Sequence, residues 1–342
     1  MIMKKLVCLF LVLTLALGLY GCKFPTVIAK EPTRPTETEP ATAPTEPQTT
    51  PQPNTSIRPL LYKVTDTQGH TLWLFGSIHV GYDYFYPLPD YVNEAYERSD
   101  AIAFEFDMRA FENNMSAQVE ALSVLMYTDG TTIKDHISKE LYEKSVAKLT
   151  EYGYYNQMLD YYKPVMWSSF LDNCLVDEMG LNSELGIDYH LLDRAYKDRK
   201  QILEVESPAF QYGMLANFSP ELQTFLLEGS LASLDDKTQS MLDMETLVAF
   251  WAAGDEANFA GYLTEEEEFE TAQERKLYEE YNNAMIVDRN LSMTDYAEAA
   301  LKSGKEVFIC VGAAHIVGPG AMAQLLAQRG YTVTMINGAV TM

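Results

Sequence analysis

The sequence predicts an α/β fold whose central sheet takes strands from both ends of the folded part, with a large helical insertion, or cap, between them. Apolar, β-prone runs concentrate in residues 60–106 and 306–336, while most of the chain between these regions follows a helical pattern. If both regions contribute to one sheet, the two ends of the folded part must lie side by side. The helical residues between them would then cover that sheet.

The first elements of the folded part form a predicted hairpin. Two β-prone runs, 60–64 and 71–76, flank a turn that contains Gly69, which is typical of two antiparallel strands. A helical pattern over 88–99 and a short apolar run over 101–106 come next. They predict a helix followed by a third strand.

The later elements are two long helical regions separated by one strand, followed by a strand–loop–helix–strand unit. The helical regions cover 110–195 and 219–303, the strand between them 201–205, and the final unit 306–311, 312–320, 321–329 and 331–336. These patterns do not determine the order of the strands in the sheet.

The first 56 residues differ in composition from the folded part of the chain. Two lysines and fifteen uncharged residues, Leu6 to Tyr20, predict a signal peptide over 1–21, since a membrane-spanning helix needs about 20 apolar residues. The run ends in Leu19-Tyr20-Gly21-Cys22, which resembles the lipobox of bacterial lipoproteins. This resemblance implies cleavage before Cys22, lipidation of its sulfur, and anchoring on the outer face of the cytoplasmic membrane. The alternative is an ordinary signal peptide that contains a cysteine.

Residues 22–56, here called the tether, contain eight of the fifteen prolines and few large apolar side chains. Such a segment cannot bury enough surface to offset its ordering entropy, so we expect a disordered, extended spacer. The folded domain is therefore predicted over 57–342. This division gives a lipid anchor, a spacer and one domain.

The composition of the chain excludes some partners and frameworks. A net charge of −24 argues against binding nucleic acid, whose phosphates need a basic surface. Beyond the tether only Cys174 and Cys310 remain, too few for a disulfide framework or a cysteine-rich metal site. Cys310 lies in an apolar run and is expected to be buried, although a single bridge between the two cysteines stays open.

One motif occurs twice and predicts the functional site. Gly76 begins a GxxH sequence that ends at His79, and Gly312 begins another that ends at His315. Each follows an apolar strand, and open α/β sheets place ligands at the C-terminal ends of their strands. We therefore expect the two histidines to share one site. Taken singly, each would more simply be a structural histidine.

Further polar residues stand in unusual positions. Glu105 and Glu204 each lie within an otherwise apolar strand, where a carboxylate must be paired, liganded or exposed to a cleft. Asp188 and His190 would converge if their segment is extended, and Arg289 interrupts a helical pattern. A guanidinium suits a carboxylate or a developing oxyanion. A buried ion-pair network is the alternative for Glu105, Glu204 and Arg289.

Together these motifs resemble the TraB/GumN family, which includes the Tiki proteases. The matching segments, in order, are the first GxxH motif, Phe104-Glu105, Lys163-Pro164 with Trp167, Gly186 to Leu192, Leu203-Glu204, Asp288-Arg289-Asn290 and the second GxxH motif with Gly318. They cover about 60–336. The resemblance implies a metal-dependent hydrolase, in which Tiki members are proteases that use Mn or Co. His79 and His315 match the paired histidines of the family, Glu105 its glutamate and Arg289 its arginine.

The leading hypothesis is therefore hydrolysis of a peptide or a small ester or amide outside the cytoplasmic membrane. His79 and His315 would bind a divalent ion, Mn, Co or Zn, with one or more of Glu105, Glu204 and Asp188 completing the ligand set. The ion would activate a water molecule, with Glu105 as a possible general base. Arg289 would stabilise the oxyanion.

Two other hypotheses stay open at this point. The family is distantly similar to erythromycin esterases, which suggests a metal-free reaction with His79 or His315 as general base and Glu105 orienting it. It is also similar to ChaN-like haem-binding proteins, which suggests a tethered binding protein for haem or a peptide. The chain contains no HExxH sequence, so a zincin-type protease is not supported.

Overall fold

The computed structural model describes residues 57–264 and 269–336. The predicted signal peptide, Cys22 and the tether lie outside these residues. Within them, the sheet takes strands from both ends of the folded part and the helices come mainly between, which confirms the predicted fold class. None of the helices in the described ranges is long and apolar enough to cross a membrane.

The sheet has six strands in the order β4-β3-β5-β2-β1-β6. The four strands β4, β3, β5 and β2 run parallel to one another, whereas β1 is antiparallel to both β2 and β6. The β1–β2 pairing confirms the predicted hairpin. The strands are β1 Leu61–Thr65, β2 Thr71–Ser77, β3 Ala101–Phe104, β4 Gln201–Glu204, β5 Val307–Gly312 and β6 Thr332–Ile336.

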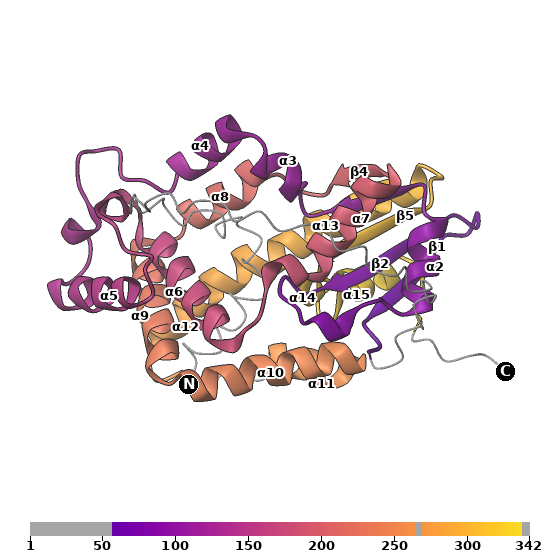
Figure 1. The fold of residues 1–342 in the computed structure, drawn as a ribbon. Helices are drawn as coiled ribbons and strands as arrows, with labels where there is room; N and C mark the ends of the chain where they lie inside the picture. The colour runs from indigo at the N-terminus through magenta and orange to yellow at the C-terminus, as the bar shows by residue number, and fades with distance from the viewer. Residues whose placement is uncertain (1–56, 265–268, 337–342) are drawn as a thin grey trace, which may run out of the picture.

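The helical insertion lies mostly beside the sheet. Figure 1 shows α5, α6, α9 and α12 gathered at the left of the molecule, to one side of the sheet, while α7 packs on β3 and α13 on β2 and β5. The α-helices are α2 Asp90–Arg98, α3 Met108–Glu112, α4 Met115–Ser123, α5 Lys139–Glu151, α6 Pro164–Met179, α7 Ile187–Asp198, α8 Pro208–Ala216, α9 Pro220–Asp235, α10 Lys237–Ala253, α11 Glu256–Thr264, α12 Ala272–Asn282, α13 Asp288–Lys302, α14 Ala313–Ile316 and α15 Met322–Gln328. Shorter turns of 3₁₀-helix are η3 Asp83–Phe85, η4 Ile133–Asp135, η5 Gln157–Tyr161 and η6 Ser183–Leu185.

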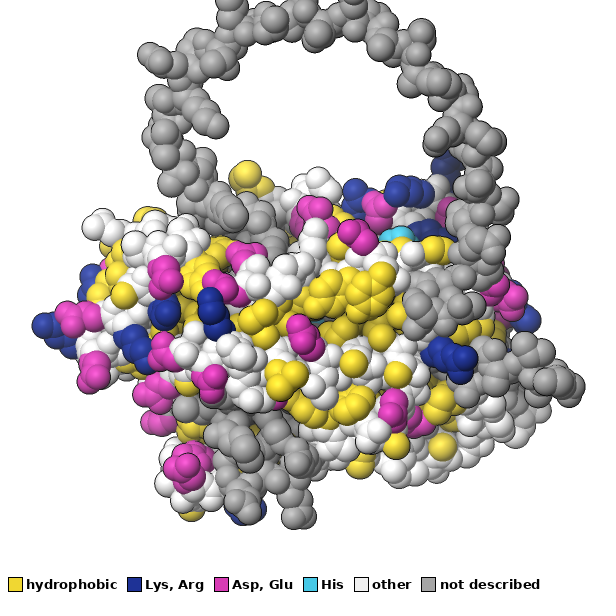
Figure 2. All heavy atoms as spheres, turned by 60° about the horizontal axis from the view of Figure 1, so that its bottom comes forward, with side chains coloured by type: hydrophobic (Ala, Val, Ile, Leu, Met, Phe, Trp, Pro, Cys, Tyr) yellow, Lys and Arg dark blue, Asp and Glu magenta, His cyan; other side chains and the backbone are white. Residues whose placement is uncertain are grey.

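The buried core follows the parallel strands. Every residue of β5 and of β3 is buried, which explains why both read as continuous apolar runs rather than alternating ones. Cys174 and Cys310 are both buried free thiols, so the bridge that the sequence left open is not formed. On the face shown in Figure 2, acidic and basic side chains are scattered around an apolar band.

Two local predictions are wrong. Strand β3 ends at Phe104, so Glu105 lies just beyond the strand rather than within it. Asp188 and His190 lie on helix α7, within the predicted helical region 110–195, and the His190 ring stacks on Tyr86 with a centroid distance of 4.0 Å. Arg289 does not interrupt a helix: α12 continues into α13 through η7, a turn of π-helix over Asn283–Val287. Such turns often occur near functional sites.

Candidate functional site

The candidate site forms where the parallel strands end. Ser77 of β2 lies opposite Gly312 of β5, and Phe104 of β3 lies opposite both Cys310 of β5 and Glu204 of β4. The C-terminal ends of four neighbouring strands therefore meet at one edge of the sheet. The residues that follow these ends include both GxxH histidines and Glu105, which the fold brings together as expected.

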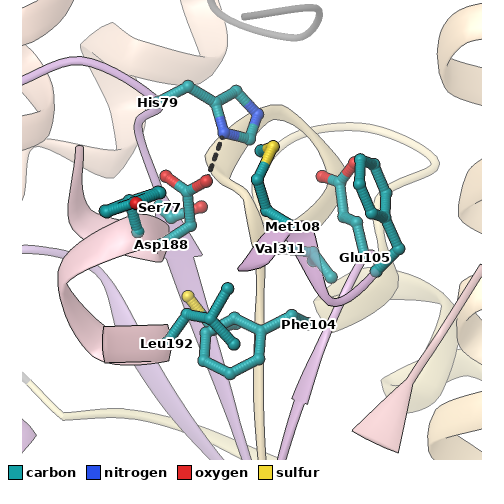
Figure 3. A pocket seen from close by; sticks show the side chains of 11 residues that line it. Ser77, His79, Phe104, Glu105, Met108, Asp188, Leu192 and Val311 are labelled. Carbon is teal, nitrogen blue, oxygen red and sulfur yellow. Dashed lines mark hydrogen bonds and ion pairs between the residues drawn. The ribbon is translucent and has the colours of Figure 1, made fainter. Parts of the chain in front are cut away.

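His79 is buried and held in one orientation by Asp188. Its Nδ1 lies 2.9 Å from Oδ2 of Asp188, which stands in the first turn of α7 (Figure 3). Its Nε2 is buried and has no hydrogen-bond partner among the described residues. Burial alone would lower the pKa of His79, but the charge and hydrogen bond of Asp188 outweigh burial, so the pKa is raised.

The loop that carries His79 is docked tightly on the start of α7. The amide of Ile187 donates to the carbonyl of Ile78 at 2.9 Å. A Cβ on Gly186 would lie 2.4 Å from the carbonyl oxygen of His79, so only glycine fits there. This contact explains the glycine that precedes Ile187-Asp188 in the sequence, because the close approach places Asp188 against the imidazole.

His315 has a matching arrangement on the second motif. It lies on α14, a single helical turn within the predicted loop 312–320, and is fully buried. Its Nδ1 lies 2.7 Å from Oδ1 of Asn290, and its Nε2 also lacks a hydrogen-bond partner among the described residues. Burial and the nearby charge of Arg289 lower the pKa of His315 to about 3. The imidazole is therefore neutral at physiological pH.

Glu105 connects β3 to the second GxxH motif. Its Oε1 accepts a hydrogen bond from the amide of Gly312 at 3.0 Å, and its Oε2 accepts from Gln211 at 2.8 Å and from Arg289 at 2.7 Å. Burial would raise the pKa of Glu105, but the charges of Arg289 and of both histidines, together with this amide, hold it below its ordinary value. Glu105 is thus a buried, ionised carboxylate with both oxygens engaged.

Arg289 is 1% exposed and donates to two carboxylates. Besides Glu105, it bonds both oxygens of Glu206, through Nε at 2.9 Å and Nη2 at 2.8 Å. Its Nη1 makes only a long contact of 3.5 Å with the carbonyl of Met285. The guanidinium therefore holds Glu105 in place, which corresponds to the buried ion-pair network rather than to a group facing a reacting oxygen.

Glu206 and Gln211 are part of this network and were missed by the sequence reasoning. Gln211 bridges Glu105 and Glu206 through its side-chain amide. A signal was present, because Glu206 follows the end of β4 as Glu105 follows the end of β3, and its amide donates to the carbonyl of Glu105. Glu204, which the sequence favoured, is exposed and accepts from the amide of Asp107. The structure does not bring Glu204 into the site.

A small pocket of about 20 Å³ lies beside His79, which is room for about one water molecule. Figure 3 shows the carboxyl groups of Asp188 and Glu105 on different sides of it, with Met108 between His79 and Glu105. Apolar side chains, including Leu192, make up much of the remaining wall. His315 is not among the side chains that line this pocket.

No three His, Cys, Asp or Glu side chains within residues 57–264 and 269–336 form a group that could hold a metal ion. Of the predicted ligands, His79 and His315 each offer an Nε2 atom that makes no hydrogen bond to the described part of the chain. Each histidine's charge also acts on Glu105, which places both near the same carboxylate. Any ion in this site would therefore depend on the two imidazoles.

Comparison with known proteins identifies the family. The chain is 26% identical over 258 residues to the uncharacterized protein YbaP of Escherichia coli (strain K12), an alignment that covers 74% of this chain and 86% of that protein. The YbaP protein of Shigella flexneri matches to the same extent. No solved structure matches the chain. The model of the TraB/PrgY/gumN family matches residues 60–335, and the chain therefore belongs to the TraB/PrgY/gumN family.

Proposed function

We propose that this protein is a hydrolase of amide or ester bonds and that His79 and His315 bind a divalent metal ion for this reaction. One observation carries the proposal: both GxxH histidines are buried, each has its Nδ1 fixed by a side-chain oxygen, and each leaves its Nε2 without a protein partner among the described residues. Both lie beside the same ionised glutamate. Peptides are the first substrates to test.

The chemistry of the two histidines fits a metal ion. Metal-bound histidines usually have the second ring nitrogen hydrogen-bonded to a carboxylate or a carbonyl, and Asp188 and Asn290 supply such oxygens here. A buried acceptor without a partner is costly, which also favours a ligand at each Nε2. Both oxygens of Glu105 are engaged by protein donors, but Oε1 accepts only one hydrogen bond and keeps a lone pair for an ion. When bound, the ion would polarise a carbonyl and lower the pKa of a water molecule.

The other residues of the site position these histidines. Asp188 fixes the tautomer of His79, and Asn290 does the same for His315. Glu105 has a lowered pKa and is therefore a weak proton acceptor at neutral pH. We assign it the role of holding the backbone of Gly312 and of supplying negative charge near both histidines, with Arg289 fixing its position.

A metal-free hydrolase is the second candidate, and one observation favours it. Asp188 raises the pKa of His79, which makes this imidazole a stronger base than an ordinary histidine. His79 also lines the pocket, so its Nε2 could accept a proton from water there. A pocket of about 20 Å³ gives no comparable support to the third hypothesis, haem binding, because a tetrapyrrole is far larger.

Metal content tests the first candidate directly. We would measure bound Mn, Co, Zn and Fe by mass spectrometry in the protein without a histidine tag and in His79→Ala, His315→Ala and His136→Ala. His136 is the control because it is exposed and stacks on Tyr127. A stoichiometric ion that only the first two variants lose supports the proposal. A wild type that binds none of these ions when they are added refutes it, whereas hydrolysis that persists after chelation supports the metal-free candidate.

We also propose that the domain is anchored outside the cytoplasmic membrane through a lipid on Cys22. The support is the signal-like run and the lipobox-like sequence before this cysteine. Replacement Cys22→Ser should release the protein from the membrane fraction, whereas Cys174→Ser should not. Equal membrane association of both variants would contradict the anchor.

A further inference from the structure

A second, larger cavity lies away from the pocket at His79. It is an open groove of about 610 Å³ between α11 and α15, with β1 and β6 contributing to its wall. We call it the α11–α15 groove. Figure 2 turns forward the side of the molecule on which α10 and α11 lie, where apolar side chains gather in the middle of the face. Its volume is in the range of pockets that hold small ligands.

Small and apolar side chains give the groove its shape. Ala257 and Ala260 face it from α11, and Ala323 and Ala327 face it from α15. These pairs are three and four residues apart, so each pair lies on one side of its helix. Short side chains on both helices leave space over the apolar side chains of β6. This space suits an elongated apolar molecule.

Polar groups at the groove point to the charge of its ligand. Tyr62 is 4% exposed, and its buried hydroxyl lies at the wall of the groove. Burial, the negative charge of Glu256 and a hydrogen bond to the Glu256 carboxylate raise the pKa of Tyr62, so the hydroxyl faces this carboxylate. Glu256 is the only charged side chain among the described residues that line the groove. A carboxylate without a neighbouring cation favours a positively charged group.

We propose that the α11–α15 groove binds an amphiphile that combines an aliphatic chain with an ammonium group. The chain would lie between the alanines of the two helices. The ammonium group would pair with Glu256 and donate to the hydroxyl of Tyr62. This ligand class matches both the apolar walls and the negative charge of Glu256, whereas a fatty acid would place its carboxylate against Glu256.

The groove is connected to the candidate site through Asn290. Gly318 and Pro319, which line the groove, follow His315 closely in the chain. The side-chain amide of Asn290 donates to the carbonyl of Gly320 at 3.0 Å, while its oxygen lies 2.7 Å from Nδ1 of His315. A ligand that presses on this loop therefore acts on a residue that orients His315. Binding in the groove should change the environment of His315.

Calorimetric titration with octylammonium and octanoate tests the ligand class. The protein carries Cys22→Ser, so that no lipid competes. We expect saturable 1:1 binding of octylammonium, about tenfold tighter than octanoate. Glu256→Gln should remove this preference, and Glu279→Gln, on an exposed part of α12, should leave it unchanged. Ala327→Phe, at an exposed position on the groove wall, should weaken the binding of both ligands.

Two results would overturn the proposal: no saturable octylammonium binding by the wild type, or equal binding by wild type and Glu256→Gln. Imidazole NMR signals test the connection to the candidate site, since the chain has only five histidines. Octylammonium should shift the signals of His315 and leave those of His136 unchanged. Binding without a shift at His315 would overturn the connection. None of these measurements depends on hydrolysis or metal binding, so they remain informative if the proposed function fails.

Discussion

Replacement of Arg289 by methionine should reverse the pH dependence of stability. Arg289 is the cation between Glu105 and Glu206, and all three side chains are nearly inaccessible, at 1%, 6% and 3% exposure. Methionine keeps much of the length of the side chain but leaves two buried carboxylates without their partner. Breaking a buried ion pair in this way costs about 3–5 kcal/mol. This is a large part of the roughly 5–15 kcal/mol that stabilises a typical domain.

The sign of the pH effect follows from the direction of each pKa shift. In the wild type the pKa of Glu105 is lowered, so its contribution is present above the unfolded pKa of about 4.3 and is lost as pH falls. In the variant the two buried carboxylates would have raised pKa values. The destabilisation caused by their buried charges would therefore be absent below about pH 4.3 and would grow as pH rises. His315, whose pKa Arg289 lowers, would also take up a proton more readily in the variant.

Urea unfolding followed by tryptophan fluorescence at pH 4.5, 6 and 7.5 measures this difference. Lys276→Met, at an exposed position on α12, is the control for loss of one positive charge. We expect Arg289→Met to be closest to wild type at pH 4.5 and least stable at pH 7.5. The reasoning is wrong if Arg289→Met loses stability in acid as the wild type does. It is also wrong if Arg289→Met lowers the free energy of unfolding at pH 7.5 by no more than Lys276→Met does.

Two further predictions concern the residues that support the histidines. Gly186→Ala should destabilise the protein by about 1–3 kcal/mol in thermal unfolding, because its Cβ would overlap the carbonyl of His79. Gly213→Ala, where a Cβ meets open space, is the control and should be neutral or stabilising. Equal effects of the two substitutions would contradict the close packing at Gly186. Asn290→Ala should weaken Zn or Co binding about 10- to 100-fold in calorimetry, because His315 loses its Nδ1 partner. Asn290→Asp should retain most of the affinity. Unchanged affinity in Asn290→Ala would show that Asn290 does not support metal binding.

The fold and the meeting of the two histidines could be predicted because their signals are local. A strand that runs into glycine and then histidine marks a strand end, and both motifs carry it. The hairpin of β1 and β2 depends on one turn, which the sequence also contains. Parallel strands then bring their ends to one edge whatever the order of the strands. That order itself depends on contacts between distant residues, which no local pattern contains.

The residues that hold the site histidines and Glu105 in place could not be predicted from local sequence patterns. Glu206 and Gln211 join Glu105 only because β4 pairs with β3 in one particular register. A shift of one residue would exchange the faces, and the apolar run around Glu204 does not specify the register. Asp188 lies in the first turn of a helix that begins at Ile187, directly after a glycine. Its contact with His79 depends on how that helix docks.

The position of β5 also determines when the molecule can become complete. β5 lies between β2 and β3, although it is made more than 200 residues after them. While the chain is being synthesised from its N-terminus, β2 and β3 each lack the neighbour that covers one edge, and uncovered edges promote wrong pairing. Folding must therefore wait for almost the whole chain, and chaperone protection until the last strands arrive would favour the correct product. A chain cut before β5 would lose the centre of the sheet and not merely one end of it.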